Sequence, residues 1–161
     1  MNGTANATAV ARPTRENVGF LLAKASQRWN ELLAERFAAA GFAEVRPSYG
    51  SVLIPLMEED GLRIGELARR ARLSKQTMTE LVRRLEGDGL VVRQPDPDDG
   101  RASLIFLSDR AHRFTPVAAR VLAELEQLVN EALKPRRVAR LTRDLQAIIA
   151  LHSGGAGVET F

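Results

Sequence analysis

The stretch from Leu73 to Ser108 constrains the fold of this chain more than any other part of the sequence. It reads LSKQTMTELVRRLEGDGLVVRQPDPDDGRASLIFLS. A segment with one apolar stripe is followed by a Gly-x-Gly stop, and then by two short β-branched runs joined by an acidic loop that ends in arginine. Apolar residues at helical spacing predict an amphipathic helix, and the β-branched runs predict a hairpin. The stretch therefore predicts a helix followed by a winged hairpin.

The predicted helix begins after Ser74, because a serine hydroxyl can accept a hydrogen bond from a free backbone N–H of the first turn. Its apolar residues recur at i, i+3, i+4 and i+7 from Met78 to Leu85, so they should share one buried face. Either Gly87 or Gly89 can end the helix in the left-handed conformation. The opposite face then carries Gln76, Glu80 and Arg83, with Lys75, Thr79 and Arg84 at its margins.

The predicted wing consists of two runs with strand composition, residues 90–92 and residues 104–107. Asp99-Gly100 is a tight-turn dipeptide between them, and two prolines should keep the rest of the intervening loop irregular. Such a loop should project from the surface.

The segment before this stretch, residues 62–72 (LRIGELARRAR), predicts another helix with arginines on its outer face. A break of about three residues separates it from the helix that follows Ser74. Two short helices joined so closely fit a helix-turn-helix, whose second helix enters the major groove of DNA. From Leu62 to Leu85 the chain carries seven basic side chains and two acidic ones, a local net charge of +5. This basic footprint lies where DNA would bind.

The composition excludes several other classes of function. The chain has 161 residues, which predicts one domain, and no cysteine, which excludes disulfide frameworks, cysteine-rich zinc sites, iron–sulfur clusters and thiol redox switches. With two histidines, no phosphate-binding glycine-rich loop and no spaced metal ligands, we expect neither an enzyme nor a cofactor or metal site. No apolar run approaches the roughly 18 residues of a membrane span, and the first 14 residues lack the features of a secretory signal, so we expect a cytoplasmic protein.

Both ends of the chain predict amphipathic helices. Residues 15–40 form one, with Gly41 placed to cap it, and residues 109–133 and 136–151 form two more. A further helix should open at Pro47, and Pro55 inside it should kink or shorten it at a cost of about 3 kcal/mol.

The helices at the chain ends carry more apolar surface than one small winged domain needs to bury. A two-fold dimer buries self-complementary stripes of this kind, whereas an intramolecular bundle is the alternative. We therefore expect a mainly α fold with a small β-hairpin wing, in which a winged helix-turn-helix lobe is joined to a helical dimerisation region from both chain ends. The expected parts are a disordered arm (1–14), a dimerisation helix (15–46), the DNA-binding lobe (47–108), two dimerisation helices (109–152) and a flexible tail (153–161).

Within this order of elements, a set of short motifs carries a resemblance to a known family. These motifs are Gly65-Glu66-Leu67-Ala68, Leu73-Ser74, Thr79, Leu81, Val82, Arg84, Leu85, Asp88-Gly89-Leu90-Val91, Arg93, the wing from Asp96 to Arg101, and Leu107-Ser108. In this order and spacing, the chain resembles the MarR family of bacterial transcriptional regulators over about residues 15–151. Two departures from the family pattern are Pro55 and the sequence Ser108-Asp109-Arg110, which replaces the more usual Thr-x-x-Gly opening of the fifth helix.

The resemblance implies a homodimer that binds a pseudo-palindromic operator on double-stranded DNA. Arg101 corresponds to the arginine that the wing inserts into the minor groove, and Asp99 to its orienting partner; a plain hairpin tip is the alternative. Glu80 should form a salt bridge with Arg83 or Arg84 within the recognition helix. The recognition-helix residues expected to contact DNA are Ser74, Lys75, Gln76, Thr79, Arg83 and Arg84.

Many members of the family respond to small aromatic acids or phenols. The residues implied for such an effector pocket are Trp29, Arg46, Tyr49 and His112, each with a structural role as its alternative. The sequence thus favours a dimeric, operator-specific regulator, more a repressor than an activator, that a small ligand releases. An architectural winged-helix protein with little sequence preference and no effector is the main alternative, since scattered arginines alone supply non-specific affinity. A protein-interaction module would leave the wing arginine unexplained.

Overall fold

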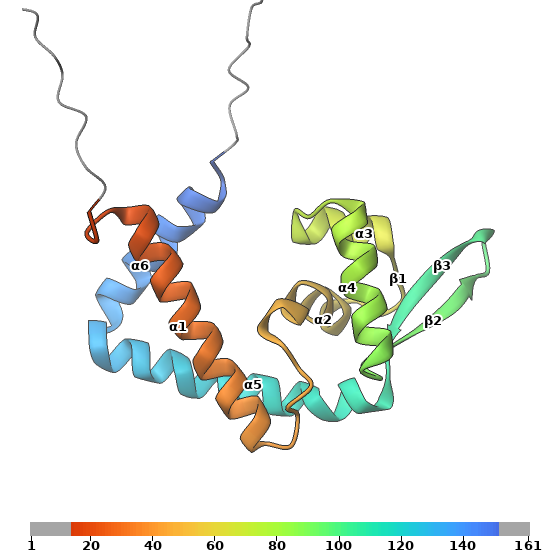
Figure 1. The fold of residues 1–161 in the computed structure, drawn as a ribbon, viewed down its shortest axis with the longest axis horizontal. Helices are drawn as coiled ribbons and strands as arrows, with labels where there is room; N and C mark the ends of the chain where they lie inside the picture. The colour runs from red at the N-terminus through yellow and green to blue at the C-terminus, as the bar shows by residue number, and fades with distance from the viewer. Residues whose placement is uncertain (1–13, 152–161) are drawn as a thin grey trace, which may run out of the picture. The chain divides into compact units, whose positions relative to one another are not determined.

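The computed structural model describes residues 14–151 of the chain, which are mainly helical with a small three-stranded antiparallel sheet (Figure 1). The predicted fold class is confirmed. The expected arm, apart from Thr14, and the expected tail lie outside the described residues. The chain divides into two units, one ending at Phe114 and the other beginning at Thr115. The first unit contains α1 (Val18–Ala39), the 3₁₀ helix η1 (Pro47–Tyr49), α2 (Gly50–Glu58), β1 (Leu62–Arg63), α3 (Ile64–Ala71), α4 (Lys75–Gly87), β2 (Val91–Asp96), β3 (Asp99–Leu107) and the start of α5 (Asp109–Leu133); the second contains the rest of α5 and α6 (Pro135–Ile149).

Helix α1 ends where the sequence predicts. Gly41 takes the left-handed conformation (φ 86°), and the N–H of Phe42 donates to the carbonyl of Phe37 at 2.9 Å. Such a bond closes the last turn of a helix. Only Leu33 and Phe37 of α1 are buried, and the Phe37 ring meets the edge of Phe114 with ring centroids 4.9 Å apart. The helix is therefore anchored in the first unit by its C-terminal half.

Helix α2 follows a 3₁₀ turn that opens at Pro47, and Pro55 lies inside it. The proline deprives the carbonyl of Ser51 of its helical hydrogen bond, but the pyrrolidine ring is buried. The helix continues for three residues beyond Pro55 and ends at an extended Glu59.

The prediction of one continuous helix over residues 62–72 is wrong at its start. Leu62 and Arg63 form β1, which pairs with Ile105 and Leu104 of β3, so that the strand order is β1-β3-β2. The reason is that the pairing partner lies about forty residues away, and a two-residue strand has no periodicity of its own. Helix α3 then runs from Ile64 to Ala71.

Helix α4 has the predicted ends. The Ser74 hydroxyl accepts a hydrogen bond from the N–H of Thr77 at 3.0 Å. Of the two glycines that could end the helix, Gly89 is the one in the left-handed conformation (φ 70°), and the N–H of Leu90 donates to the carbonyl of Leu85 at 2.9 Å. Three residues separate α3 from α4, as expected for a helix-turn-helix.

The strands of the wing are longer than the sequence predicts. Strands β2 and β3 continue to a turn at Pro97-Asp98, so that the expected turn at Asp99-Gly100 is wrong and both of those residues lie in β3. The turn forms two residues earlier because the Asp96 carboxylate accepts a hydrogen bond from the N–H of Asp98 at 2.9 Å. Pro95 is tolerated because β2 is an edge strand of the sheet.

Helix α5 spans residues 109–133 as predicted, and the Ser108 hydroxyl accepts a hydrogen bond from the N–H of Ala111 at 3.2 Å. Helix α6 follows Lys134, which has a positive φ of 67°, and none of its residues is buried. No helix among residues 14–151 combines the length and the apolar character needed to cross a membrane. The buried residues that connect the elements of the first unit include Tyr49, Val52, Leu56, Leu67, Met78, Val82, Leu85, Leu90, Ile105 and Ala111.

Candidate nucleic-acid interface

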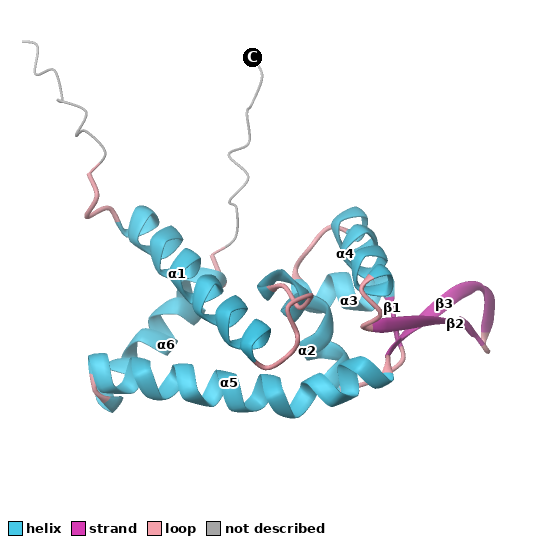
Figure 2. Ribbon diagram, turned by 60° about the horizontal axis from the view of Figure 1, so that its bottom comes forward, coloured by secondary structure: helices cyan, strands magenta, loops and turns pink. Residues whose placement is uncertain are grey.

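The core of the first unit fixes the exposed face of α4. Helix α4 packs against α3, and its residues Met78, Val82 and Leu85 are completely buried. Because these three side chains lie on one side of the helix, the other side faces solvent (Figure 2). The outer face of α4 is therefore held rigidly by its own core contacts.

Two of the predicted DNA-binding residues on α4 are engaged with the helix itself. The Ser74 hydroxyl caps the first turn, and the Thr79 hydroxyl donates to the carbonyl of Lys75 at 2.7 Å. The side chains of Gln76 and Lys75 are exposed, and neither has a hydrogen-bond partner within residues 14–151. The Gln76 amide and the Lys75 ammonium are thus available to an external molecule.

The predicted salt bridge within α4 is present. The Glu80 carboxylate accepts hydrogen bonds from Nε of Arg83 at 3.0 Å and from Nε of Arg84 at 3.0 Å. These bonds, that of Arg83 first, lower the pKa of Glu80 from 4.5 to about 2. The carboxylate is therefore negative at neutral pH, and the three side chains together carry one net positive charge.

Several of the basic side chains between Leu62 and Leu85 are ion-paired within the protein. Arg69 and Arg70 share the carboxylate of Glu66 at 2.6 and 2.7 Å, and Arg70 also pairs with Glu59. The two arginines lower the pKa of Glu66 to about 2. The charge count of the sequence therefore overstates how much of the basic surface is unpaired. Exposed ion pairs are weak, however, so these guanidinium groups can exchange their carboxylates for phosphates.

The wing carries an exposed arginine close to its turn. Figure 1 shows β2 and β3 extending away from α3 and α4. Arg101 lies on β3 and is exposed, and its backbone N–H donates to the Asp99 carboxylate at 3.0 Å. In this structure Asp99 thus contacts Arg101 through the backbone, and the pairing of its carboxylate with the guanidinium stays a prediction.

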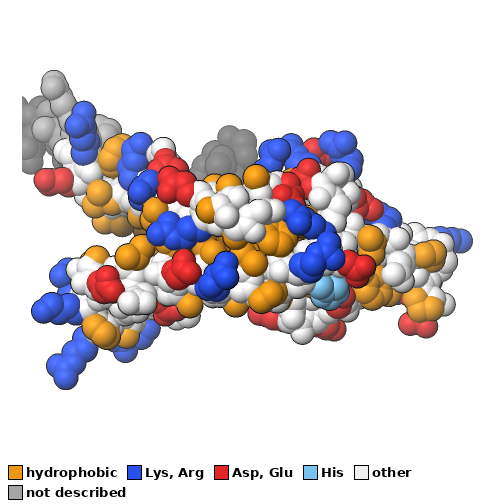
Figure 3. Space-filling model, turned by 90° about the horizontal axis from the view of Figure 1, so that it is seen from below, with side chains coloured by type: hydrophobic (Ala, Val, Ile, Leu, Met, Phe, Trp, Pro, Cys, Tyr) orange, Lys and Arg blue, Asp and Glu red, His pale blue; other side chains and the backbone are white. Residues whose placement is uncertain are grey.

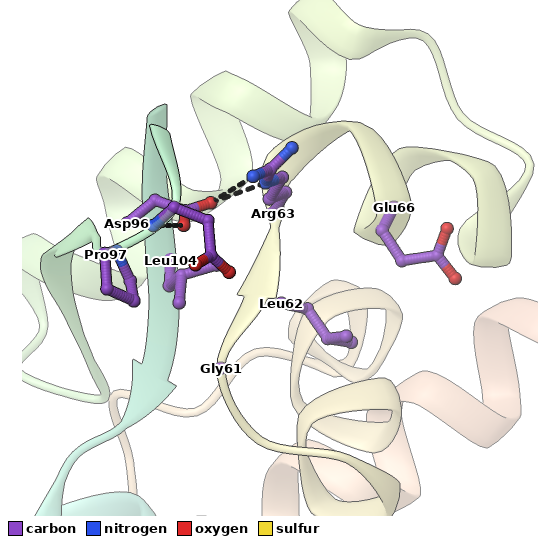
Figure 4. Close-up of a pocket in the computed structure, with 8 residues that line it drawn as sticks. Gly61, Leu62, Arg63, Glu66, Asp96, Pro97 and Leu104 are labelled. Carbon is purple, nitrogen blue, oxygen red and sulfur yellow. Dashed lines mark hydrogen bonds and ion pairs between the residues drawn. The ribbon is translucent and has the colours of Figure 1, made fainter. Parts of the chain in front are cut away.

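Two further residues, Asp96 beside the turn of the wing and Arg63 on β1, were not identified from the sequence. Asp96 is 4% exposed, and its Oδ2 accepts a hydrogen bond from Nε of Arg63 at 2.6 Å (Figure 4). The hydrogen bond from the N–H of Asp98 and, next, the bond from Arg63 lower the pKa of Asp96. An aspartate before Pro-Asp is a sequence signal for a turn, but nothing local identifies its partner Arg63, 33 residues away.

The residues implied for an effector pocket lie in different surroundings. Tyr49 is 1% exposed, and its hydroxyl donates to Oδ2 of Asp88 at 2.5 Å. Burial and this bond raise the pKa of Tyr49. Trp29 is half-buried, whereas Arg46 and His112 are exposed. None of the four lines an open cavity of about 310 Å³ between β1, the start of α3 and the turn of the wing, which is lined by Gly61, Leu62, Arg63, Glu66, Asp96, Pro97, Asp98 and Leu104.

Large apolar side chains are exposed on the helices near both ends of the chain. Space-filling Figure 3 shows hydrophobic side chains at the surface between basic and acidic ones. Scattered exposed apolar residues are ordinary, but several on one helix mark an interaction surface. The exposed residues are Val18, Phe20 and Leu21 of α1, Leu122 and Leu128 of α5, and Leu141, Ile148 and Ile149 of α6.

A helix-turn-helix followed by a projecting hairpin defines a winged helix-turn-helix protein. The sequence profile of the MarR family matches residues 47–103, which contain this motif. A transcriptional repressor of Mycobacterium bovis, Mb2911, is 31% identical over 117 residues, which are 65% of this chain and 78% of the relative. The chain belongs to the MarR family. Two other curated regulators are matched over only 30% and 58% of their length, so the chain spans less than two thirds of those relatives.

Solved structures share the fold over most of the chain. The PcaV regulator of Streptomyces coelicolor, in complex with its natural ligand, superposes with a TM-score of 0.72 and 25% identity, over 86% of this chain and 96% of that one. The repressor CouR, bound to a 23-mer DNA duplex, gives a TM-score of 0.70 and 25% identity, over 88% of this chain and 100% of that one.

Proposed function

We propose that this protein is a homodimeric, sequence-specific DNA-binding regulator of transcription that acts as a repressor in the cytoplasm. The observation that carries the proposal is the outer face of α4, where Gln76 and Lys75 are exposed on a helix whose other side is fully buried. A rigid helix with free polar side chains is what reading of the major groove requires. The DNA-bound structure of CouR, which shares the fold, supports the same role for α4 here.

Each exposed side chain has a defined chemistry toward DNA. A glutamine amide pairs with adenine through two hydrogen bonds, and a lysine contacts guanine or phosphate. Arg83 and Arg84 contact phosphates once they leave Glu80, while Ser74 and Thr79 approach the backbone or a thymine methyl group. Arg101 enters the minor groove beside the operator half-site, where the negative potential attracts a guanidinium, and Asp99 orients it.

The dimer is formed by residues 15–46 and 109–152, and residues 47–108 form the DNA-binding lobe. The exposed apolar residues of α6 supply a self-complementary surface, because no residue of that helix is buried. Two recognition helices then lie about 34 Å apart, one turn of DNA. The dimer thereby matches the symmetry of a pseudo-palindromic operator.

A small aromatic or phenolic ligand releases the protein from DNA. The ligand-bound structure of PcaV supports an effector, since it shares this fold. The proposed pocket includes Trp29, Arg46, Tyr49 and His112. Tyr49 contacts Asp88, the C-terminal cap residue of α4, so a ligand that displaces Tyr49 shifts the recognition helix.

The decisive experiment compares two DNA duplexes across a salt series: the region upstream of the protein's own gene and a scrambled duplex of equal length. We expect a preference of about a thousandfold for the first duplex. Arg101→Ala should lower operator affinity by about tenfold, and Gln76→Ala should change the preferred bases.

Matched controls separate charge and stability from recognition. Arg136→Ala on α6 removes the same charge as Arg101→Ala, and Gln127→Ala on α5 removes the same amide as Gln76→Ala. Equal and steeply salt-dependent binding of the parent to both duplexes, over a set of upstream regions, would favour an architectural DNA-binding protein instead. The observation in favour of that alternative is the set of ion-paired arginines on α3 and α4, because they can exchange their carboxylates for phosphates of any DNA sequence.

A further inference from the structure

We infer that the ion pair between Arg63 and Asp96 is a clamp that sets the wing in its DNA-binding position and so acts on DNA through Arg101. The inference rests on the proposed function, because Arg101 must be a DNA contact for its position to matter. Arg63 is the last residue of β1, and Asp96 is the last residue of β2. The clamp therefore joins the start of the helix-turn-helix to the outer part of the hairpin (Figure 4).

Both guanidinium nitrogens of Arg63 that face the wing use the same carboxylate oxygen. Nε and one terminal nitrogen lie 2.6 and 2.5 Å from Oδ2 of Asp96. The Asp96 side chain is 3% exposed, whereas that of Arg63 is 51% exposed. A carboxylate removed from water in this way needs its charged partner, so the pair resists opening more than the exposed pairs on α3 and α4 do.

The other oxygen of Asp96 shapes the end of the wing. Oδ1 accepts the hydrogen bond from the N–H of Asp98, and the strand register is irregular between Pro95 and Asp96. Asp96 then faces Asp99, which in turn accepts from the N–H of Arg101. One carboxylate thus fixes the turn with one oxygen and attaches that turn to β1 with the other.

The outer hairpin has little else to hold it. Within residues 94–101, Asp96 is the only buried residue, and β1 pairs with β3 no further toward the turn than Leu104. A two-stranded ribbon without a packed face is marginally stable in water. The clamp extends the support of β1 beyond the last paired residue. It thereby reduces the conformational entropy that is lost when Arg101 enters the groove.

The position of Arg63 supports a role outside its own helix. Arg63 is the N-terminal cap residue of α3, yet its side chain makes no capping hydrogen bond. Serine, threonine, asparagine or aspartate is the usual choice at such a position, because each can accept from the free N–H groups. The side chain at this position instead pairs with the wing.

The test uses two neighbouring aspartates of the same turn in the full-length dimer. Asp96→Asn keeps an oxygen for the N–H of Asp98 and loses only the charged pair with Arg63. Asp98→Asn removes the same negative charge from an exposed residue whose side chain makes no hydrogen bond or ion pair within the wing. Electrostatics alone predicts slightly tighter DNA binding for both variants. We expect Asp98→Asn to follow this prediction and Asp96→Asn to bind the operator about fivefold more weakly.

A double-mutant cycle with Arg101→Ala distinguishes positioning from a general structural role. In the Arg101→Ala background we expect Asp96→Asn to cause no further loss, because the arginine that the clamp positions is gone. A loss of the same size in both backgrounds would overturn the inference. Arg63→Gln, with Arg136→Gln on α6 as its charge-matched control, repeats the test from the exposed side of the pair and replaces Asp96→Asn if that variant unfolds.

The outcomes separate the inference from the proposed function. If the parent protein binds operator and scrambled DNA equally, the proposed function fails before any variant is compared. If the parent is specific but Asp96→Asn and Asp98→Asn bind alike, the clamp inference is wrong and the regulator remains. Thermal unfolding of each variant, followed by circular dichroism, establishes that the compared proteins are folded.

Discussion

Helices α4 and α6 have a similar amphipathic character and opposite environments. Both are short, rich in arginine and amphipathic, with 13 and 15 residues. Helix α4 buries Met78, Val82 and Leu85, whereas no residue of α6 is buried. An apolar stripe predicts that a helix face will be covered but not what covers it. The winged lobe completes its core within one chain, and the stripe of α6 remains available to a second one.

The ends of the two helices differ in the same way. Helix α4 begins at a serine that caps it and ends at a left-handed glycine, and Arg93 of β2 pairs with Glu86 near its C-terminus at 3.0 Å. Helix α6 begins after Lys134, whose side chain makes no capping hydrogen bond. Local sequence therefore fixes α4 at both ends, whereas α6 depends more on what packs against it.

The largest expected effect comes from placing charge on the exposed stripe of α6. Leu141→Glu combined with Ile148→Glu introduces four carboxylates into each proposed dimer interface. Burying an unpaired charge costs several kcal/mol, so we expect the dimer to dissociate at all practical concentrations and operator affinity to fall by about a hundredfold or more. Sedimentation velocity measures the first effect, and DNA titration the second.

The matched control adds the same charges to the polar face of the same helix. By helical spacing, Ala139 and Ala147 lie away from the stripe that contains Leu141 and Ile148. Ala139→Glu with Ala147→Glu should therefore leave the dimer intact. If the parent protein is a monomer, or if both pairs of substitutions dissociate the dimer, the proposal that α6 forms the interface is wrong.

The next effect contrasts a buried leucine with an exposed one. Leu85 of α4 is 0% exposed and Leu141 of α6 is 39% exposed. Leu85→Ala should lower the free energy of unfolding by about 2–5 kcal/mol, since it leaves a cavity in the core of the lobe. Leu141→Ala should lower the free energy of unfolding by less than about 1 kcal/mol in a monomeric background. The single variant Ile148→Glu, which keeps Leu141, serves as that background.

Urea unfolding at fixed protein concentration measures both values, because a dimer makes stability depend on concentration. Equal losses in the two variants would show that α6 belongs to the same cooperative core as α4. A larger loss for Leu141→Ala in the parent protein than in the monomeric background would instead point to the dimer interface.

The parts of the fold that the sequence predicts are those fixed by neighbouring residues. The limits of α4 follow from Ser74 and Gly89, and the pairing of Glu80 with Arg83 and Arg84 follows from helical spacing. Strand β1 could not be predicted, because its two residues gain their structure from β3, about forty residues later. The turn of the wing was misplaced for a related reason: Asp99-Gly100 is the stronger turn signal, but the side chain of Asp96 decides between the two positions.

The candidate site shows the same limit. The exposed face of α4 and the position of Arg101 near the wing turn follow from local patterns. The clamp between Arg63 and Asp96 does not, since both residues look like ordinary surface charges in the sequence, and the burial of Asp96 is a property of the folded lobe. The link between Tyr49 and Asp88 spans 39 residues and was equally hidden.

The smallest expected effect is a pH dependence that distinguishes the lobe from α6. The pKa values of Glu66 and Glu80 are about 2 in the folded protein, against an ordinary value of 4.5 for a glutamate in the unfolded chain. Because the folded-state pKa is the lower one, these carboxylates stabilise the fold above about pH 4.5, and this contribution is lost as the pH falls toward 2. Helix α6 has one ion pair among its described residues, Arg140 with Asp144 at 3.8 Å. We therefore expect acid to destabilise the winged lobe more than α6.

Glu80→Gln tests this expectation, because it removes one of the two carboxylates and should flatten the dependence of urea unfolding on pH between 4.5 and 2. Glu126→Gln on α5 is the control, since that carboxylate makes no ion pair within the described part of the chain. The effect should be small and should shrink further in high salt, because Glu80, Arg83 and Arg84 are all exposed. The same substitution leaves Arg83 and Arg84 free for phosphate, so Glu80→Gln should bind scrambled DNA more tightly while it loses acid sensitivity. Unchanged binding to scrambled DNA would show that Arg83 and Arg84 contact phosphate independently of Glu80.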